Sequence, residues 1–209
     1  MSKRNLVIGA IAISALLALS LNSLALDLKP LYSFFETLIV LLTVILSSKR
    51  IIKSSYAKFI FIGLALYLLG HISLMFPPYF PYGSYSFVVA NLSFIIAFSR
   101  LDSQNHKVPL IILALIGLIS FLTSYEIGIV RILSEVNLFI LLFMCWKGLN
   151  PYLTHKNKGN KQTAAAVCLL LFSYACVNGV LHSSFIEVAG AVSYWTAITL
   201  LAISTYSQP

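Results

Sequence analysis

Apolar runs of about 20 residues recur along this 209-residue chain, separated by short polar segments. A helix of that length matches the hydrocarbon thickness of a bilayer. Because lipid offers no hydrogen-bond partners, the backbone of each run must satisfy its own N–H and C=O groups, as an α-helix does. The sequence therefore predicts an all-α integral membrane bundle of about eight transmembrane helices. These are residues 5–26, 31–48, 57–76, 85–99, 108–124, 127–146, 163–182 and 186–205.

The composition agrees with a membrane protein. Only 10% of the residues are charged, whereas soluble domains carry about 25%. The length suits one bundle, so we expect a single transmembrane domain over residues 1–209. The apolar stretch 5–26 follows a basic start, as in a signal peptide, but it is longer than a typical signal sequence core. We therefore interpret it as a retained first transmembrane helix.

The net charge of +8 is distributed unevenly. Twelve of the 14 basic residues lie before the first predicted helix or after the second, fourth and sixth, so these twelve fall on one side of the membrane, whereas Lys29 falls on the opposite side and Arg131 lies within a predicted helix. The positive-inside rule then places both termini in the cytoplasm, and we expect a bacterial inner (plasma) membrane. This pattern accounts for the positive charge without a nucleic-acid partner. The basic residues on the predicted cytoplasmic side are Lys3, Arg4, Lys49, Arg50, Lys53, Lys58, Arg100, Lys107, Lys147, Lys156, Lys158 and Lys161.

Two of the connections between the apolar runs have a distinctive composition. The turn "PPYFPYG", residues 77–83, is rich in proline and aromatic residues and is typical of an aromatic belt at the outer interface. A lid over a site is the alternative. The segment "LNPYLTHKNKGNKQ", residues 149–162, is predicted to be a solvated connector that can also meet anionic lipid head groups.

Ionisable residues within the predicted spans are functional candidates, because burying them in a membrane is costly. Glu36 in the second helix and His71 in the third have no evident partner in sequence, and each is open to a structural or a cavity-lining interpretation. Arg131 and Glu135 are four residues apart and are expected to pair. The remaining polar residues favour hydrogen bonds between helices or, near a helix end, a side chain that reaches the interface. They are Asn91, Tyr174, Asn178 and His182.

The sequence predicts no cofactor and no metal. The three cysteines, Cys145, Cys168 and Cys176, have no paired spacing and suit small apolar positions in helices. Histidine and acidic residues lie on different helices without a spacing typical of metal ligands.

Five segments, in order, resemble the YhhN/TMEM86 family of eight-helix membrane proteins, some of which are lysoplasmalogenases. The resemblance covers most of the chain and implies the same bundle and a lysolipid substrate with a vinyl ether bond. The segments are "LDLKPL" (26–31), "GLALYLLGHISLMF" (63–76), "GSYSFVVANLSFIIAF" (83–98), "AAVCLLLFSYACVNGVL" (165–181) and "SYWTAITLLA" (193–202).

The chain departs from the family where the chemistry is expected. The family's two intramembrane aspartates would fall at His71 and Tyr174, and a family histidine would fall at Asn91. Hydrolysis of a vinyl ether needs an acid to protonate the alkene carbon, stabilisation of an oxocarbenium and an attacking water, roles that suit two carboxyl groups. An imidazole can still serve as the acid, and Glu36 is a candidate for the missing negative charge.

Three functions are consistent with these residues. The first is a lysoplasmalogenase-like lipid hydrolase. The second is an inactive family member that binds lipid or acts as an accessory subunit with a protein partner in the membrane. The third, with the least support, is a small transporter. For the first, the predicted catalytic residues are His71, Glu36 and Tyr174, and the predicted substrate-binding residues are Lys29, Asn91, Asn178, His182, Tyr194 and Trp195.

Overall fold

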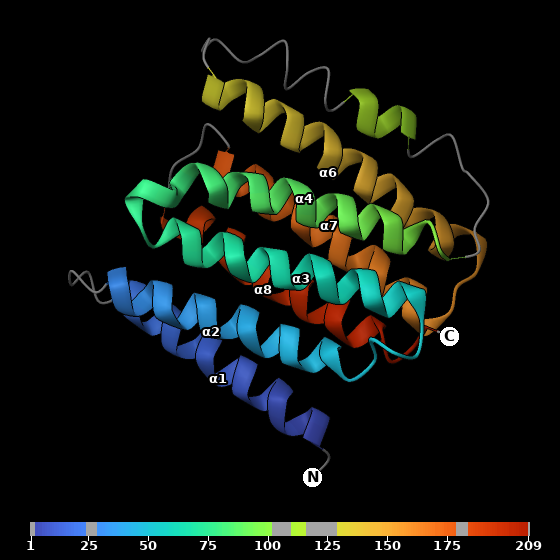
Figure 1. Ribbon diagram of the computed structural model, residues 1–209, viewed down its shortest axis with the longest axis horizontal. Helices are drawn as coiled ribbons and strands as arrows, with labels where there is room; N and C mark the ends of the chain where they lie inside the picture. Colours follow the sequence, from blue (N-terminus) through green and yellow to red (C-terminus); the bar gives the residue numbers. More distant parts are fainter. Residues whose placement is uncertain (1–2, 24–28, 102–109, 116–128, 179–183, 209) are drawn as a thin grey trace.

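The fold is a bundle of α-helices, seen in a computed structural model that describes residues 3–23, 29–101, 110–115, 129–178 and 184–208 (Figure 1). No strand occurs among these residues. A single 3₁₀ turn, η1, covers Pro77–Tyr79, and a short helical piece covers residues 110–115. The longer helices are α1 (Lys3–Ser23), α2 (Lys29–Ser48), α3 (Ser55–Leu74), α4 (Phe80–Phe98), α6 (Ile129–Thr154), α7 (Lys158–Asn178) and α8 (Ser184–Ser204).

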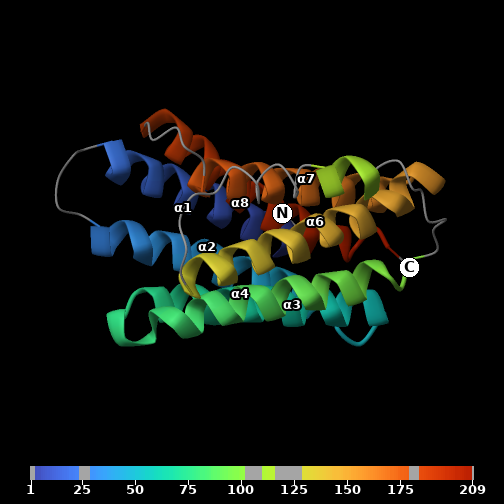
Figure 2. The ribbon, with the colours of Figure 1, turned by 90° about the horizontal axis from the view of Figure 1, so that it is seen from above.

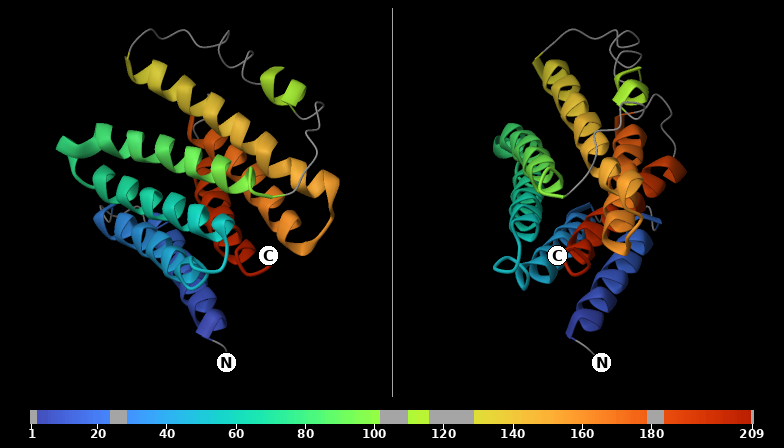
Figure 3. Two further views of the ribbon diagram at one scale, coloured as in Figure 1. Left: turned by 45° about the vertical axis from the view of Figure 1, so that its right-hand side comes forward. Right: turned by 90° about the vertical axis from the view of Figure 1, so that its right-hand side faces the viewer.

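Helix α8 lies inside the bundle and contacts α1, α2, α3 and α7. Seen from above, α3 and α4 form one side of the bundle and α1, α7 and α8 the other (Figure 2). Helices α1 and α2 lie at the opposite edge from α6 and the piece 110–115 (Figure 3). All seven long helices contribute to the buried core, α1 through Ile11 and Ala18, so the core runs through the whole bundle.

The two described chain ends lie at the same end of the bundle as the α2–α3, α4 and α6–α7 turns (Figure 1). Basic side chains meet the C-terminus there. The guanidinium carbons of Arg50 and Arg4 lie 4.8 Å and 5.8 Å from the ring centroid of Tyr206. Burial raises the pKa of Tyr206, although Arg50 and Arg4 act in the opposite direction, and its hydroxyl donates a hydrogen bond to the Leu46 carbonyl at 2.8 Å. We call this end, defined by residues 48–54, 99–101, 154–161 and 204–208, the basic end.

Four described helices are long and apolar enough to cross a membrane: Leu31–Ser48, Ser55–Leu74, Glu135–Thr154 and Phe185–Ser204. Shorter apolar stretches occur at Arg4–Ser20 in α1 and Tyr82–Phe98 in α4. Large apolar side chains on the outside of the bundle, such as Leu16 at 65% exposure and Phe185 at 80%, agree with a surface that faces lipid. The predicted all-α membrane bundle is therefore confirmed.

Several predicted boundaries were wrong, for identifiable reasons. Helix α4 begins at Phe80 instead of residue 85, because Pro81 lies in the first turn, where a missing N–H costs nothing. Tyr79 and Tyr82 are exposed with ring centroids 6.4 Å apart, as expected for an aromatic belt.

The predicted connector 149–162 is mostly helical. Helix α6 continues through Pro151 to Thr154, and α7 begins at Lys158, so residues 155–157 alone connect them. The prediction took the polar side chains as a sign of a solvated connector, but two of them, Asn150 and Asn160, are buried. Of the predicted helix 108–124, residues 110–115 are helical and the rest lies outside the described residues.

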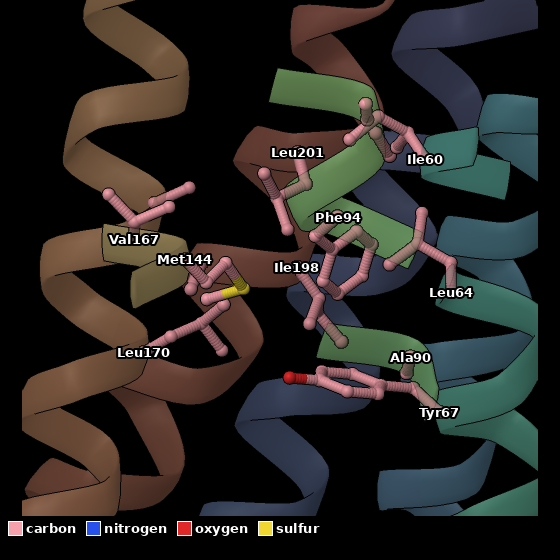
Figure 4. Close-up of a cluster of buried hydrophobic side chains, with 14 of the residues drawn as sticks. Ile60, Leu64, Tyr67, Ala90, Phe94, Met144, Val167, Leu170, Ile198 and Leu201 are labelled. Atoms are coloured by element: carbon pink, nitrogen blue, oxygen red, sulfur yellow. The ribbon is translucent and has the colours of Figure 1, made fainter. Parts of the chain in front are cut away.

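Helices α3 and α4 pack closely because two glycines of α3 face two phenylalanines of α4. A Cβ placed on Gly63 would clash with the Phe94 ring, and one on Gly70 would lie 2.9 Å from Phe87 Cζ. The Phe94 side chain is fully buried and lies between the α3 residues and those of α8 in the core (Figure 4). Without a hydrophobic force between helices in lipid, such close contact is a main source of helix association.

We expect Gly63→Ala to destabilise the bundle by about 1–3 kcal/mol, because the buried Phe94 ring has no room to move away. Thermal unfolding of the purified protein in detergent measures the change. The matched control is Gly9→Ala in α1, where nothing lies within 4 Å of the added Cβ and the stability should be unchanged or slightly raised. Equal stability of the two variants would show that the α3–α4 contact is not tightly packed.

Candidate functional site

A line of polar side chains joins α3, α4 and α6 within the bundle. The Tyr67 hydroxyl donates to Asn91 Oδ1 at 2.6 Å, and Asn91 Nδ2 donates to Asn137 Oδ1 at 3.1 Å. Tyr67 and Asn91 are 4% and 3% exposed. The Tyr67 ring also meets Phe87 and Phe94 edge-on, each at a centroid distance of 5.3 Å. Tyr67 is therefore fixed by its hydroxyl and by both sides of its ring.

His71 lies one turn beyond Tyr67 on α3 and contacts α8. Its Nε2 is 2.9 Å from the hydroxyl of Tyr194, and the tautomer of the ring decides which group donates. The Tyr194 ring stacks on Tyr67 with centroids 5.8 Å apart and an interplanar angle of 29°. Phe87 packs edge-on against the imidazole at 5.5 Å. This side of His71 is thus enclosed by aromatic rings and has one polar neighbour.

Helix α2 carries an acid and packs against α8. Glu36 is partly buried and lies one turn after Tyr32 on α2. Trp195 follows Tyr194, and its ring lies 6.4 Å from that of Tyr32. Trp195 is 3% exposed, and its Nε1–H has no hydrogen-bond partner among the described residues. This part of the bundle therefore contains the carboxyl group of Glu36, the phenol of Tyr32 and the indole N–H of Trp195.

We call the set Glu36, Tyr67, His71, Asn91, Tyr194 and Trp195 the polar centre. Four of the residues singled out in the sequence as catalytic or substrate-binding meet here by direct contact or on adjacent positions of α8: His71, Tyr194, Trp195 and, through Tyr67, Asn91. Glu36 lies on α2, which packs against α8. His71 lies one turn from Tyr67 on α3, and Asn91 is hydrogen-bonded to Tyr67.

Tyr174 and His71 lie on helices that do not contact each other. Helices α3 and α7 do not pack against each other, while α8 contacts both. Tyr174 is partly buried on α7 against the core. Its catalytic role stays a prediction.

Other predicted residues lie wholly or partly outside the described part of the chain. His182 is among the residues that are not described, and for three more only the backbone is described: Lys29, Arg131 and Asn178. The predicted pairing of Arg131 with Glu135 and the substrate contacts of the other three stay predictions.

Among the described side chains, no group of three or more histidine, cysteine or acidic residues gathers. Cys145 is buried and donates to the Val167 carbonyl at 3.2 Å, which is a structural contact. The imidazole, phenols and amide of the polar centre are suited to proton transfer and hydrogen bonding.

Sequence reasoning missed Tyr67 and Asn137. Tyr67 has the signal that would have revealed it, since it stands four residues before His71 and so on the same face of the helix. Asn137 is an amide inside an apolar run, like Asn91, and could have been selected on the same ground.

Comparison with known families gives a match to the YhhN family over residues 31–205, which include every residue of the polar centre. Searches of the curated proteins and of the solved structures found no match. Because the family match covers most of the chain, including helices α2 to α8, this protein belongs to the YhhN family.

Proposed function

We propose that this chain is a lipid-active membrane protein of the lysoplasmalogenase type, which hydrolyses the vinyl ether bond of lysoplasmalogen or a related lysolipid. The observation that carries the proposal is the contact of His71 Nε2 with the Tyr194 hydroxyl at 2.9 Å. His71 is an ionisable group at a position where the resemblance to the family implies an acid, and α2, which carries Glu36, packs against the helix of Tyr194. Membership of the YhhN family supports the class of activity.

In this mechanism His71 protonates the alkene carbon farther from the ether oxygen. The other alkene carbon becomes an oxocarbenium, which the negative charge of Glu36 stabilises. Water adds to this carbon and loses a proton, giving a hemiacetal. The hemiacetal collapses to a fatty aldehyde and the glycerol hydroxyl, so the proton returns to the site and the overall reaction consumes one water.

The remaining polar-centre residues have positioning roles in this proposal. Tyr194 orients the imidazole through its hydroxyl, and Tyr67 supports the Tyr194 ring by stacking. The unpartnered Trp195 Nε1–H is a donor for an oxygen of the lysolipid glycerol, because a buried donor without a partner costs about 1–3 kcal/mol. A single-tailed lipid can enter from the bilayer between helices.

A second candidate function is a lipid-binding or accessory subunit without catalysis, acting with a protein partner. It is favoured by the aromatic rings of Tyr67, Phe87 and Tyr194, which pack around His71. It is also favoured by the replacement of the family acids. Both functions are expected in a bacterial inner membrane, and both involve a membrane lipid or lysolipid.

We expect His71→Phe to lower the release of fatty aldehyde from lysoplasmalogen by at least about 100-fold, because the ring nitrogen that supplies the proton is lost. His71→Asp restores the residue of the family and should retain or raise the activity. The assay is aldehyde release by the purified protein, with thermal unfolding to confirm that each variant is folded. Undiminished activity of His71→Phe would rule out the acid role.

We expect Glu36→Gln to lower the same activity by about 100-fold, since the amide keeps the shape and removes the negative charge. The matched control is Glu187→Gln in the first turn of α8, which should leave turnover unchanged. Equal losses in both variants would contradict the role of Glu36. If the wild-type protein binds a lysolipid but releases no aldehyde, the hydrolase proposal fails and the lipid-binding function stands.

A further inference from the structure

The basic end holds a cavity of about 350 Å³ that the proposed function does not use. Its lining comes from the starts of α3 and α7, the end of α4 and the C-terminal residues, and includes Ser55, Arg100, His155, Asn157 and Gln208. Ser55 opens α3 and His71 lies in its last turn. At 1.5 Å per residue the two are about 24 Å apart along the helix axis. The cavity is therefore separate from the polar centre.

The wall of the cavity is fixed by a buried asparagine. Asn160, 3% exposed, donates from Nδ2 to the carbonyls of Pro151 at 2.9 Å and His155 at 2.8 Å. Its Oδ1 accepts a hydrogen bond from Gln208 Nε2 at 2.7 Å. One side chain thus joins the end of α6, the start of α7 and the C-terminus. The cavity has a preformed shape, as ligand pockets generally do.

The charge of the lining is positive. Within the described part of the chain, Arg100 has no ion-pair partner and the lining contains no acidic residue. A guanidinium with its donors free is suited to bind the oxygens of a phosphate in a forked geometry. Ser55 and Asn157 add polar groups.

The two helices that start at the cavity strengthen this charge. Helix α3 is capped by Ser54, whose side chain accepts from Ala57 N at 3.1 Å, and α7 by Asn157, whose side chain accepts from Asn160 N at 2.7 Å. Both helices span 20 residues or more, and the positive ends of their dipoles are directed toward the cavity.

From this arrangement we propose that the cavity at the basic end binds the phosphate group of an anionic ligand, with Arg100 as its principal contact. By the distribution of basic residues this end faces the cytoplasm. Two sources supply such a group there: the head group of an anionic phospholipid in the inner leaflet, and a soluble phosphate compound. The site is independent of the lysolipid chemistry proposed above.

The test measures binding to the purified full-length chain with two probes: inorganic phosphate in detergent, by calorimetry, and phosphatidylglycerol in nanodiscs, by thermal stabilisation relative to phosphatidylcholine. We expect at least one probe to bind, and Arg100→Gln to weaken that binding by about tenfold or more, because a charge-assisted hydrogen-bonded pair is lost. Phosphate binding identifies a soluble ligand. An effect of phosphatidylglycerol alone identifies a lipid head group.

Two further variants keep the test decisive. Lys161→Gln removes a positive charge from the exposed start of α7 outside the cavity lining and should change binding by less than about twofold. Ser55→Glu adds an acid that suits the first turn of a helix, so it should fold and yet abolish binding. The proposal is overturned if neither probe binds, or if Arg100→Gln and Lys161→Gln weaken binding equally.

Discussion

The contact between two glycines of α3 and two phenylalanines of α4 is the constraint on which the polar centre depends. In lipid, helices gain little from burying apolar surface, so they associate where small residues let backbones and rings come close. Gly63 and Gly70 stand seven residues apart and face Phe94 and Phe87, which are also seven apart. Tyr67 lies between the glycines in sequence, with Asn91 between the phenylalanines.

This spacing sets the whole geometry of the polar centre. With both rings fixed, Tyr67 has one orientation, in which its hydroxyl meets Asn91 and its face is open to Tyr194. Tyr194 then reaches His71, one turn further along α3. A buried polar group that is satisfied on every side gives a single arrangement of the helices around it. The packing contacts and the hydrogen bonds of the polar centre therefore act together to join α3, α4, α6 and α8.

The basic end and the polar centre are stabilised by different interactions. At the basic end, hydrogen bonds from Asn160 and Gln208 hold short turns together, and cations lie over the Tyr206 ring. The polar centre instead surrounds a few polar groups with aromatic rings. The two regions are about 24 Å apart along α3, from Ser55 to His71, so they are distinct parts of the bundle.

The sequence by itself determined the membrane class, because a helix is the way for a long apolar run to satisfy its backbone in lipid. It also placed most of the basic residues at one end and indicated His71 and Asn91 as polar positions inside the bundle. The prediction of a solvated connector failed at Asn150 and Asn160, because polar residues are typical of loops but these two are buried. Burial of an amide depends on partners that other parts of the fold supply. Only the tertiary structure decided that Tyr194, and not a residue of α7, faces His71. The reason is that α8 lies between α3 and α7, and helix order in space is set by side-chain packing that no single run of sequence contains.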